Sequence, residues 1–452
     1  SGDAGAMERE ARAATRRVDT SASDREDISE VEYRQVRLER VVLVGLRTTQ
    51  SEEEAENSLR ELAALAETAG SRVMDGVIQR RSLPEPATYL GSGKAKELAD
   101  IVRAHEADTV IVDEELAPSQ RRGLEDVVDA KVVDRTALIL DIFAQHAKSR
   151  EGKAQVELAQ LEYLLPRLRG WGESMSRQAG GRVAGGAGIG SRGPGETKIE
   201  LDRRRIRARM AKLKAEIARM EPARRTQRGA RRRGGVPSVA IAGYTNAGKS
   251  TLLNCLTDAG VLVEDALFAT LDPTVRRART ADGREYTLTD TVGFVRNLPT
   301  QLVEAFRSTL EEVGAADVLL HVVDAAHPDP VSQVEAVRSV LSGIEGTDRI
   351  PELIALNKAD LATPEQLAVL RTAFPESVAL SAKTGYGVGT LRAALEDLLP
   401  RPSVLIDVVI PYSAGSLVHR VHEEGEVERE EYAAEGTRLV ARVDEALAAA
   451  VR

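Results

Sequence analysis

Short apolar runs alternate with amphipathic stretches through the first third of the chain. Four runs of four to seven residues are rich in Val, Ile and Leu, which predicts buried strands at 41–46, 73–79, 109–112 and 131–134. Between them, apolar residues recur every three or four positions, as in 51–69, which predicts helices. Strands that alternate with helices indicate an α/β domain on a mostly parallel sheet, over residues 36–135.

Longer helical patterns follow this domain. Between 136 and 169 the chain contains one glycine and one proline, and its apolar residues keep helical spacing. A second long helix is predicted over Thr197–Met220, ended by Glu221-Pro222, with residues 223–235 as a basic linker. Two such helices around a polar connection predict an antiparallel hairpin over 136–222, and an arm of about 20 residues would project ~30 Å.

The rest of the chain predicts two further domains. Strand and helix patterns over 236–400 indicate a doubly wound sheet. From 404 onward, a strand, a helix over 414–422 and strands over 427–432 and 437–443 predict a small α+β domain, 401–452. The first 35 residues are charged and poor in apolar residues, which predicts a disordered acidic extension. The expected fold class is therefore a multidomain α/β protein whose N-terminal domain carries a helical hairpin.

The most specific motif lies at the start of the central domain. A short apolar run precedes the residues Gly-Tyr-Thr-Asn-Ala-Gly-Lys-Ser, and a helical pattern follows them, which is the strand, glycine loop and helix order of a P-loop. In such a loop the backbone N–H groups cradle phosphates, Lys249 reaches the β- and γ-phosphates, and the Ser250 hydroxyl ligates Mg²⁺. The residues expected to bind the nucleotide here are Gly243, Tyr244, Thr245, Asn246, Ala247, Gly248, Lys249, Ser250 and Thr251.

Three later motifs complete a guanine-nucleotide site. In Asp290-Thr291-Val292-Gly293, the aspartate would reach the Mg²⁺ shell and the glycine N–H the γ-phosphate. In Asn357-Lys358-Ala359-Asp360, the Asp360 carboxylate can accept hydrogen bonds from N1–H and the 2-amino group of guanine, donors that adenine does not present together. Ser381-Ala382-Lys383 would supply a backbone N–H for guanine O6. The order and spacing of these motifs predict a GTPase domain over 236–400.

The segment Val261–Pro273 is the expected first switch loop. Thr270 and Thr274 are both candidates to close on Mg²⁺ and the γ-phosphate, and their spacing does not decide between them. Phe294 stands where many GTPases keep a glutamine that orients the attacking water, so we expect slow intrinsic hydrolysis. Asn246 could help to hold K⁺ beside the phosphates, and a structural hydrogen bond is the alternative.

Charge is unevenly distributed along the 452 residues. The chain carries a net charge of −9, yet from Arg167 to Arg233 twenty Lys and Arg residues face six Asp and Glu, so this segment carries +14 and the remainder −23. Such a block favours a polyanionic partner. No apolar run approaches the roughly 18 residues of a membrane span, and one cysteine excludes an internal disulfide. We therefore expect a cytoplasmic protein with no membrane partner.

A glycine-rich stretch joins the two predicted hairpin helices. Eight of the sixteen residues from Gly180 to Gly195 are glycine, and none is acidic. This composition is also typical of a flexible linker, but two packed helices need only a few connecting residues. A basic tip with few side chains lets the backbone approach RNA closely while arginines bind phosphates or stack on bases. The expected RNA contacts in the tip, 178–195, and beside it are Arg177, Arg182, Arg192 and Lys198.

Taken together, the chain from about Val36 onward resembles the HflX family of ribosome-associated GTPases, within the group that also holds Obg. The resemblance rests on four stretches: the motif at 193–198 with its preceding glycines, and residues 141–147, 268–274 and 290–294. The arginine-rich segment 223–235 is more similar to actinobacterial members. The resemblance favours Thr270 over Thr274. It implies that the catalytic residues are Lys249, Thr270 and Gly293, and that the Mg²⁺ ligands are Ser250, Thr270 and Asp290.

The resemblance also implies a function that the residues alone do not show. HflX proteins bind the 50S subunit with the hairpin tip directed toward the peptidyl-transferase centre in 23S rRNA. They dissociate 70S ribosomes under stress and hydrolyse GTP faster on the 50S subunit. Some members bind ATP through the N-terminal domain and are credited with RNA unwinding, and actinobacterial members are linked to antibiotic tolerance.

Two alternatives to a splitting factor stay open. The first is a 50S assembly or storage factor that leaves joined ribosomes intact. The second is an ATP-driven RNA helicase in the N-terminal domain, where Gly91-Ser92-Gly93-Lys94 resembles half of a nucleotide loop, although a glycine turn that caps a helix is the commoner explanation. A monomer is expected for a factor that must fit a ribosomal site.

Overall fold

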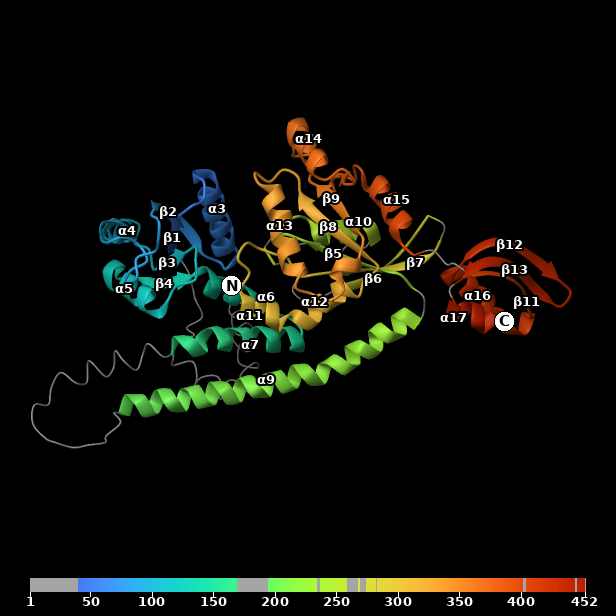
Figure 1. The fold of residues 1–452 in the computed structure, drawn as a ribbon, viewed down its shortest axis with the longest axis horizontal. Coiled ribbons are helices and arrows are strands. Elements are labelled where there is room, and N and C mark those ends of the chain that lie inside the picture. Colours follow the sequence, from blue (N-terminus) through green and yellow to red (C-terminus); the bar gives the residue numbers. More distant parts are fainter. Residues whose placement is uncertain are drawn as a thin grey trace, which may run out of the picture.

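The computed structural model describes residues 40–168, 194–233, 236–257, 267–268, 274–281, 283–400, 404–443 and 445–451, which form three β-sheets and a long helical hairpin (Figure 1). The predicted extension 1–35 lies outside the described residues. So do most of the tip, 178–195, and most of the first switch loop, 261–273.

The first sheet is parallel throughout, with the strand order β2-β1-β3-β4. Its strands are β1 (Arg40–Arg47), β2 (Arg72–Arg80), β3 (Thr109–Val112) and β4 (Lys131–Asp134), and its connecting helices are α3 (Glu52–Thr68), α4 (Ser92–Ala104) and α5 (Pro118–Val128). Ser51 begins α3 with a capping box, in which its hydroxyl accepts from the Glu54 N–H at 3.1 Å. The four strands expected from the apolar runs are confirmed.

The expected long helix over 136–169 is wrong, because the chain forms two helices there, α6 (Arg135–His146) and α7 (Arg150–Arg167). Ala147 has an extended backbone, and Ser149 caps α7 by accepting from the Gly152 N–H at 2.8 Å. A serine hydroxyl satisfies a free N–H at a helix start, so it favours a new helix here. The apolar periodicity continues across the break and therefore gave no sign of it.

The second arm of the hairpin, α9 (Pro194–Arg233), has 40 residues, which makes it about 60 Å long. It does not end at Glu221-Pro222 as expected but continues through most of the expected linker, 223–235. A proline removes one helical hydrogen bond, and the alanines and arginines that follow favour helix enough to carry it on. In Figure 1, α9 runs alongside α7 and extends beyond it. The buried apolar residues between the two arms are Ala154, Leu158, Leu161, Leu168, Ile206 and Leu213.

The central sheet has the order β10-β9-β8-β5-β7-β6, and only β6 is antiparallel to its neighbour. Its strands are β5 (Ser238–Gly243), β6 (Thr274–Arg279), β7 (Glu285–Asp290), β8 (Val318–Asp324), β9 (Glu352–Asn357) and β10 (Val378–Ala379). The helices are α10 (Lys249–Thr257), α11 (Thr300–Ala305), α12 (Arg307–Gly314), α13 (Pro330–Leu341), α14 (Pro364–Ala373) and α15 (Val388–Leu398). This is the expected doubly wound sheet, in which the carboxyl ends of parallel strands share one edge.

The third sheet is small and antiparallel, in the order β11-β13-β12, as expected for an α+β module. Its elements are β11 (Val404–Ile410), α16 (Gly415–Glu424), β12 (Glu426–Ala433), β13 (Gly436–Val443) and α17 (Glu445–Val451). Ile406, Leu439 and Leu447 lie in its own core.

The first two sheets share one hydrophobic core. Leu62 of α3 and Phe143 of α6 belong to the same buried cluster as Phe294 and Phe306 of the central domain. The Phe143 ring lies 4.5 Å from that of Phe268 and 5.7 Å from that of Phe306, centroid to centroid. The helices before the hairpin therefore pack directly against the central domain. Among the described helices, none combines the length and apolar character needed to cross a membrane.

Candidate functional site

The loop between β5 and α10 forms a tight turn beside the carboxyl end of β9. Gly248 has φ +92°, and a Cβ there would lie 2.2 Å from the amide nitrogen of Asn357, so only glycine fits. Asn357 is 3% exposed; its amide donates to the Ala247 carbonyl at 2.8 Å and its oxygen accepts from the Ala382 N–H at 2.9 Å. One side chain thus joins three of the sequence motifs.

Lys249 is buried at the start of α10, and its ammonium donates to the Tyr244 carbonyl at 2.9 Å. Burial lowers the pKa of Lys249 to about 8, while the nearby carboxylate of Asp290 opposes this shift. A cation held in a poorly solvated loop interacts strongly with any anion that enters. The loop can therefore bind a phosphate group with one charge and its backbone N–H groups.

Ser250 and Asp290 meet at the place expected for a metal. The Ser250 hydroxyl lies 3.0 Å from the Asp290 carboxylate, which ends β7. A hydroxyl and a carboxylate are the hard oxygen donors that Mg²⁺ prefers alongside substrate phosphates, so these residues fit the ion. Thr270, the third expected ligand, lies outside the described residues.

Gly293 lies against Lys249, the lysine expected to bind phosphate. A Cβ at Gly293 would be 2.8 Å from Thr245 Cγ2 and 3.1 Å from the Lys249 ammonium, so no larger residue fits without movement. Phe294 is 1% exposed and pairs through its backbone with the loop, where its carbonyl accepts from the Thr245 N–H at 2.7 Å. Its ring is in the core and cannot orient a water molecule.

The motifs expected to bind the guanine base lie at the ends of β9 and β10. Lys358 donates to the Asp324 carboxylate at 2.7 Å, and Ser381, which is fully buried, accepts from the Thr384 N–H at 3.2 Å. Asp360 and Lys383 are exposed beside them. Strand ends therefore bring together the motifs that are far apart in sequence, as expected at this edge of an α/β sheet.

Three of the expected RNA-binding residues, Arg177, Arg182 and Arg192, lie outside the described residues, and Lys198 is on α9 in a stretch whose side chains are also outside them. In the N-terminal domain, Gly91 is the N-cap of α4, and its N–H donates to the Gln79 side chain at 2.9 Å. This geometry fits the helix-cap explanation of 91–94.

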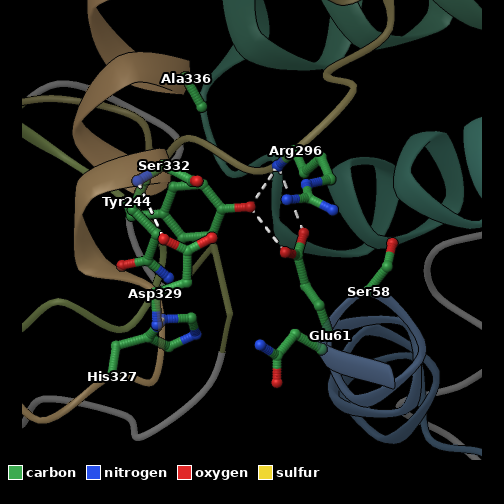
Figure 2. Close-up of a pocket in the computed structure, with 10 residues that line it drawn as sticks. Ser58, Glu61, Tyr244, Arg296, His327, Asp329, Ser332 and Ala336 are labelled. Carbon is green, nitrogen blue, oxygen red and sulfur yellow. Dashed lines mark hydrogen bonds between the residues drawn. The ribbon is translucent and has the colours of Figure 1, made fainter. Parts of the chain in front are cut away.

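The side chain of Tyr244 points away from the loop toward α3, where its hydroxyl donates to Glu61 at 2.6 Å (Figure 2). The sequence pattern placed Tyr244 in the nucleotide loop but did not reveal Glu61. Asp324, the partner of Lys358, was also missed, although an acidic residue at the end of an apolar strand is a usable signal.

Comparison with known proteins finds matching family models and a similar solved structure. Family models described as "GTP-binding GTPase N-terminal", "GTP-binding GTPase Middle Region" and "50S ribosome-binding GTPase" match residues 56–144, 146–231 and 238–358. A crystal structure of a GTP-binding protein from Sulfolobus solfataricus with GDP is 25% identical, covers 80% of this chain and 98% of its own, and has a TM-score of 0.41.

Two relatives match over most of their length. GTPase HflX of Lacrimispora saccharolytica is 46% identical over 88% of this chain and 92% of its own. GTPase HflX of Escherichia coli is 43% identical over 87% of this chain and 90% of its own. The chain therefore belongs to the HflX family of GTPases and is a GTP-hydrolysing enzyme.

Proposed function

We propose that this GTPase binds the 50S subunit in its GTP form, splits 70S ribosomes and leaves the subunit after hydrolysis. The observation that carries the proposal is the hairpin of α7 and α9, whose second arm is about 60 Å long and bears exposed arginines. A rigid basic arm that extends from a nucleotide switch suits docking into structured RNA. The matched model described as "50S ribosome-binding GTPase" supports the choice of subunit.

The arms of the hairpin are held together by more than apolar packing. Arg209 of α9 forms two hydrogen bonds with the Glu157 carboxylate of α7, at 2.6 and 2.8 Å. In the turns of α9 just before Arg209, Arg204, Arg205 and Arg207 are exposed. The first group stiffens the hairpin, and the second is available to phosphates.

In the nucleotide site we assign roles by position. Lys249 and the Gly293 N–H contact the γ-phosphate, and Ser250, Asp290 and Thr270 hold Mg²⁺ when it is bound. Asp360 accepts hydrogen bonds from the guanine edge, with Lys383 beside it. The residues that bind GTP or GDP are 243–251, 381–383, Asp290, Asn357, Lys358 and Asp360. K⁺ at Asn246 remains an alternative to a purely structural role for that residue, which adopts φ +57°. The protein acts as a monomer in the cytoplasm.

The experiment is sucrose-gradient sedimentation of purified 70S ribosomes with the protein and a non-hydrolysable GTP analogue. We expect 70S to convert into 30S and 50S, with the protein on 50S. Replacing both Arg182 and Arg192 with Ala should weaken 50S binding and leave GTP affinity unchanged. If the protein sediments with 50S while 70S stays whole, it is an assembly or storage factor instead, and if it binds no particle the ribosomal function is wrong.

A further inference from the structure

Three segments that are distant in sequence meet at the hydroxyl of Tyr244. The hydroxyl donates to one oxygen of Glu61 in α3 at 2.6 Å, and it accepts a short hydrogen bond from the backbone N–H of Arg296. The same N–H lies 3.3 Å from the other Glu61 oxygen. Figure 2 shows the tyrosine and glutamate side chains directed at each other with Arg296 beside them. The N-terminal domain thus touches the nucleotide loop and the segment after Gly293 at one point.

Glu61 is itself fixed by a buried cation. Arg135, at the start of α6 and 2% exposed, donates to Glu61 and also to Asp113 at 2.7 Å. Burial alone would lower the pKa of Arg135, but the carboxylates of Glu61 and Asp113 outweigh it and raise the pKa. Ser58 donates to the second Asp113 oxygen at 2.5 Å. Arg135 thus holds one oxygen of Glu61 in place, and the other carboxylate oxygen can act only as an acceptor toward Tyr244.

The Tyr244 hydroxyl therefore always donates its hydrogen bond to Glu61. Tyr244 is 5% exposed, and burial together with the Glu61 carboxylate raises its pKa, so the hydroxyl stays protonated across the physiological range. Once it donates to Glu61, its lone pairs are available for the Arg296 N–H. The Glu61 carboxylate thus orients the Tyr244 hydroxyl as a donor, which leaves the hydroxyl oxygen to accept from the Arg296 N–H.

This junction is close to the groups that act on GTP. The Tyr244 carbonyl accepts from the Lys249 ammonium at 2.9 Å. On either side of Tyr244 the loop pairs with Phe294, through Thr245 N–H at 2.7 Å and Gly243 carbonyl at 3.2 Å. Arg296 is three residues from Gly293, so the position of its N–H constrains where the Gly293 N–H can lie.

The same junction continues toward the hairpin. Asp134, the residue before Arg135, accepts from the Tyr163 hydroxyl of α7 at 2.8 Å and from the Leu116 N–H at 3.0 Å. Of these two neighbouring residues, Arg135 is linked to the nucleotide loop through Glu61, and Asp134 is linked to the hairpin through Tyr163. A polar path joins the two functional regions inside the shared core.

We propose that Tyr244 and Glu61 are positioning residues for GTP hydrolysis: they hold residues 293–296 against the nucleotide loop from the N-terminal domain. Phe294 occupies the place of a water-orienting glutamine, so the order of this segment has to come from its surroundings. This inference requires that the protein hydrolyses GTP, but it does not require that the protein binds ribosomes. All the contacts it uses lie within the free protein.

The test uses the full-length protein without ribosomes, so its outcome is separate from that of the sedimentation experiment. Tyr244→Phe keeps the ring and removes the hydroxyl, and Tyr286→Phe removes the hydroxyl of another buried tyrosine, in β7, as the matched control. We expect the single-turnover rate constant of GTP hydrolysis to fall about tenfold in Tyr244→Phe, with GDP affinity within about twofold of the original. Tyr286→Phe should leave both unchanged.

A double-mutant cycle separates positioning from general destabilisation. Glu61→Gln removes the charge that orients the hydroxyl, so the double variant Glu61→Gln/Tyr244→Phe should hydrolyse GTP within about twofold of Tyr244→Phe alone. Thermal unfolding of every variant shows that each is folded at the assay temperature. An unchanged rate in Tyr244→Phe, an equal fall in Tyr286→Phe, or rate losses that multiply in the double variant would each overturn the proposal.

Discussion

The nucleotide loop and the hairpin both carry cations, but in opposite environments. In the loop, Lys249 is 7% exposed and fixed to the Tyr244 carbonyl. On α9, Arg204, Arg205 and Arg207 stand in solvent. Water screens an exposed charge, whereas a buried one keeps most of its Coulomb energy for the anion it meets. One substitution in the loop should therefore lower activity or nucleotide affinity more than several substitutions on the hairpin lower 50S affinity.

The difference also concerns shape. Backbone N–H groups and a fixed lysine define a single geometry for a phosphate, which is what a chemical reaction requires. A row of exposed arginines tolerates many geometries and gives affinity that depends on salt. Four experiments test this contrast between a buried, fixed cation and exposed ones, in descending order of the expected effect.

Lys249→Ala should lower GTP hydrolysis by on the order of 10³-fold, because the variant lacks the charge that faces the β- and γ-phosphates. Single-turnover hydrolysis and GDP titration measure the loss. Lys212→Ala, at an exposed position of α9, is the control and should change neither quantity. A similar loss in both variants would mean that buried and exposed lysines do not differ in this protein.

Asp360→Asn should weaken GTP binding by about 100-fold and reverse the preference between GTP and xanthosine triphosphate. The amide can still accept from N1–H, but its NH₂ group opposes the 2-amino group of guanine and matches the 2-oxo group of xanthine. Competition binding with the two nucleotides is the measurement. Asp348→Asn, an exposed aspartate of the same domain, should keep the original preference. If the preference survives in Asp360→Asn, this carboxylate does not read the base.

The contrast between the two regions also explains how far the sequence could predict them. The nucleotide site depends on local patterns, a glycine loop and polar residues after apolar strands, so its candidate residues could be named from the sequence. The junction at Tyr244 depends on Glu61, which is 183 positions away and lies on a helix with no local sign of its partner. Likewise, apolar spacing predicted the arms of the hairpin but not the break at Ser149 or the helix beyond Pro222, since capping and the residues after a proline decide these.

The hairpin contributes through several exposed charges. Replacing Arg204, Arg205 and Arg207 together with Ala should lower 50S affinity about tenfold near 0.15 M salt and reduce the slope of log K against log salt by about 2 to 3. Sedimentation or filter binding over a salt series gives both numbers. A triple variant of Arg72, Lys96 and Arg103, exposed in the N-terminal domain, changes net charge equally and should keep the slope. Equal slopes in both triple variants would show that these arginines of α9 do not contact RNA.

The smallest effect comes from proton linkage at the loop. Burial lowers the pKa of Lys249 to about 8, and bound phosphates favour the charged form, so the complex has a higher pKa than the free protein. Above pH 8 most molecules of the free protein have lost this proton and must take it up to bind GDP. The dissociation constant should therefore be nearly flat below pH 7 and rise roughly fourfold between pH 7 and 8.5. Lys249→Ala, measured over the same range, removes this rise and corrects for titration of the nucleotide itself. If GDP affinity of the unsubstituted protein does not change up to pH 8.5, the ammonium in the empty loop is better solvated than its burial implies, and the distinction between the loop and the hairpin is one of geometry alone.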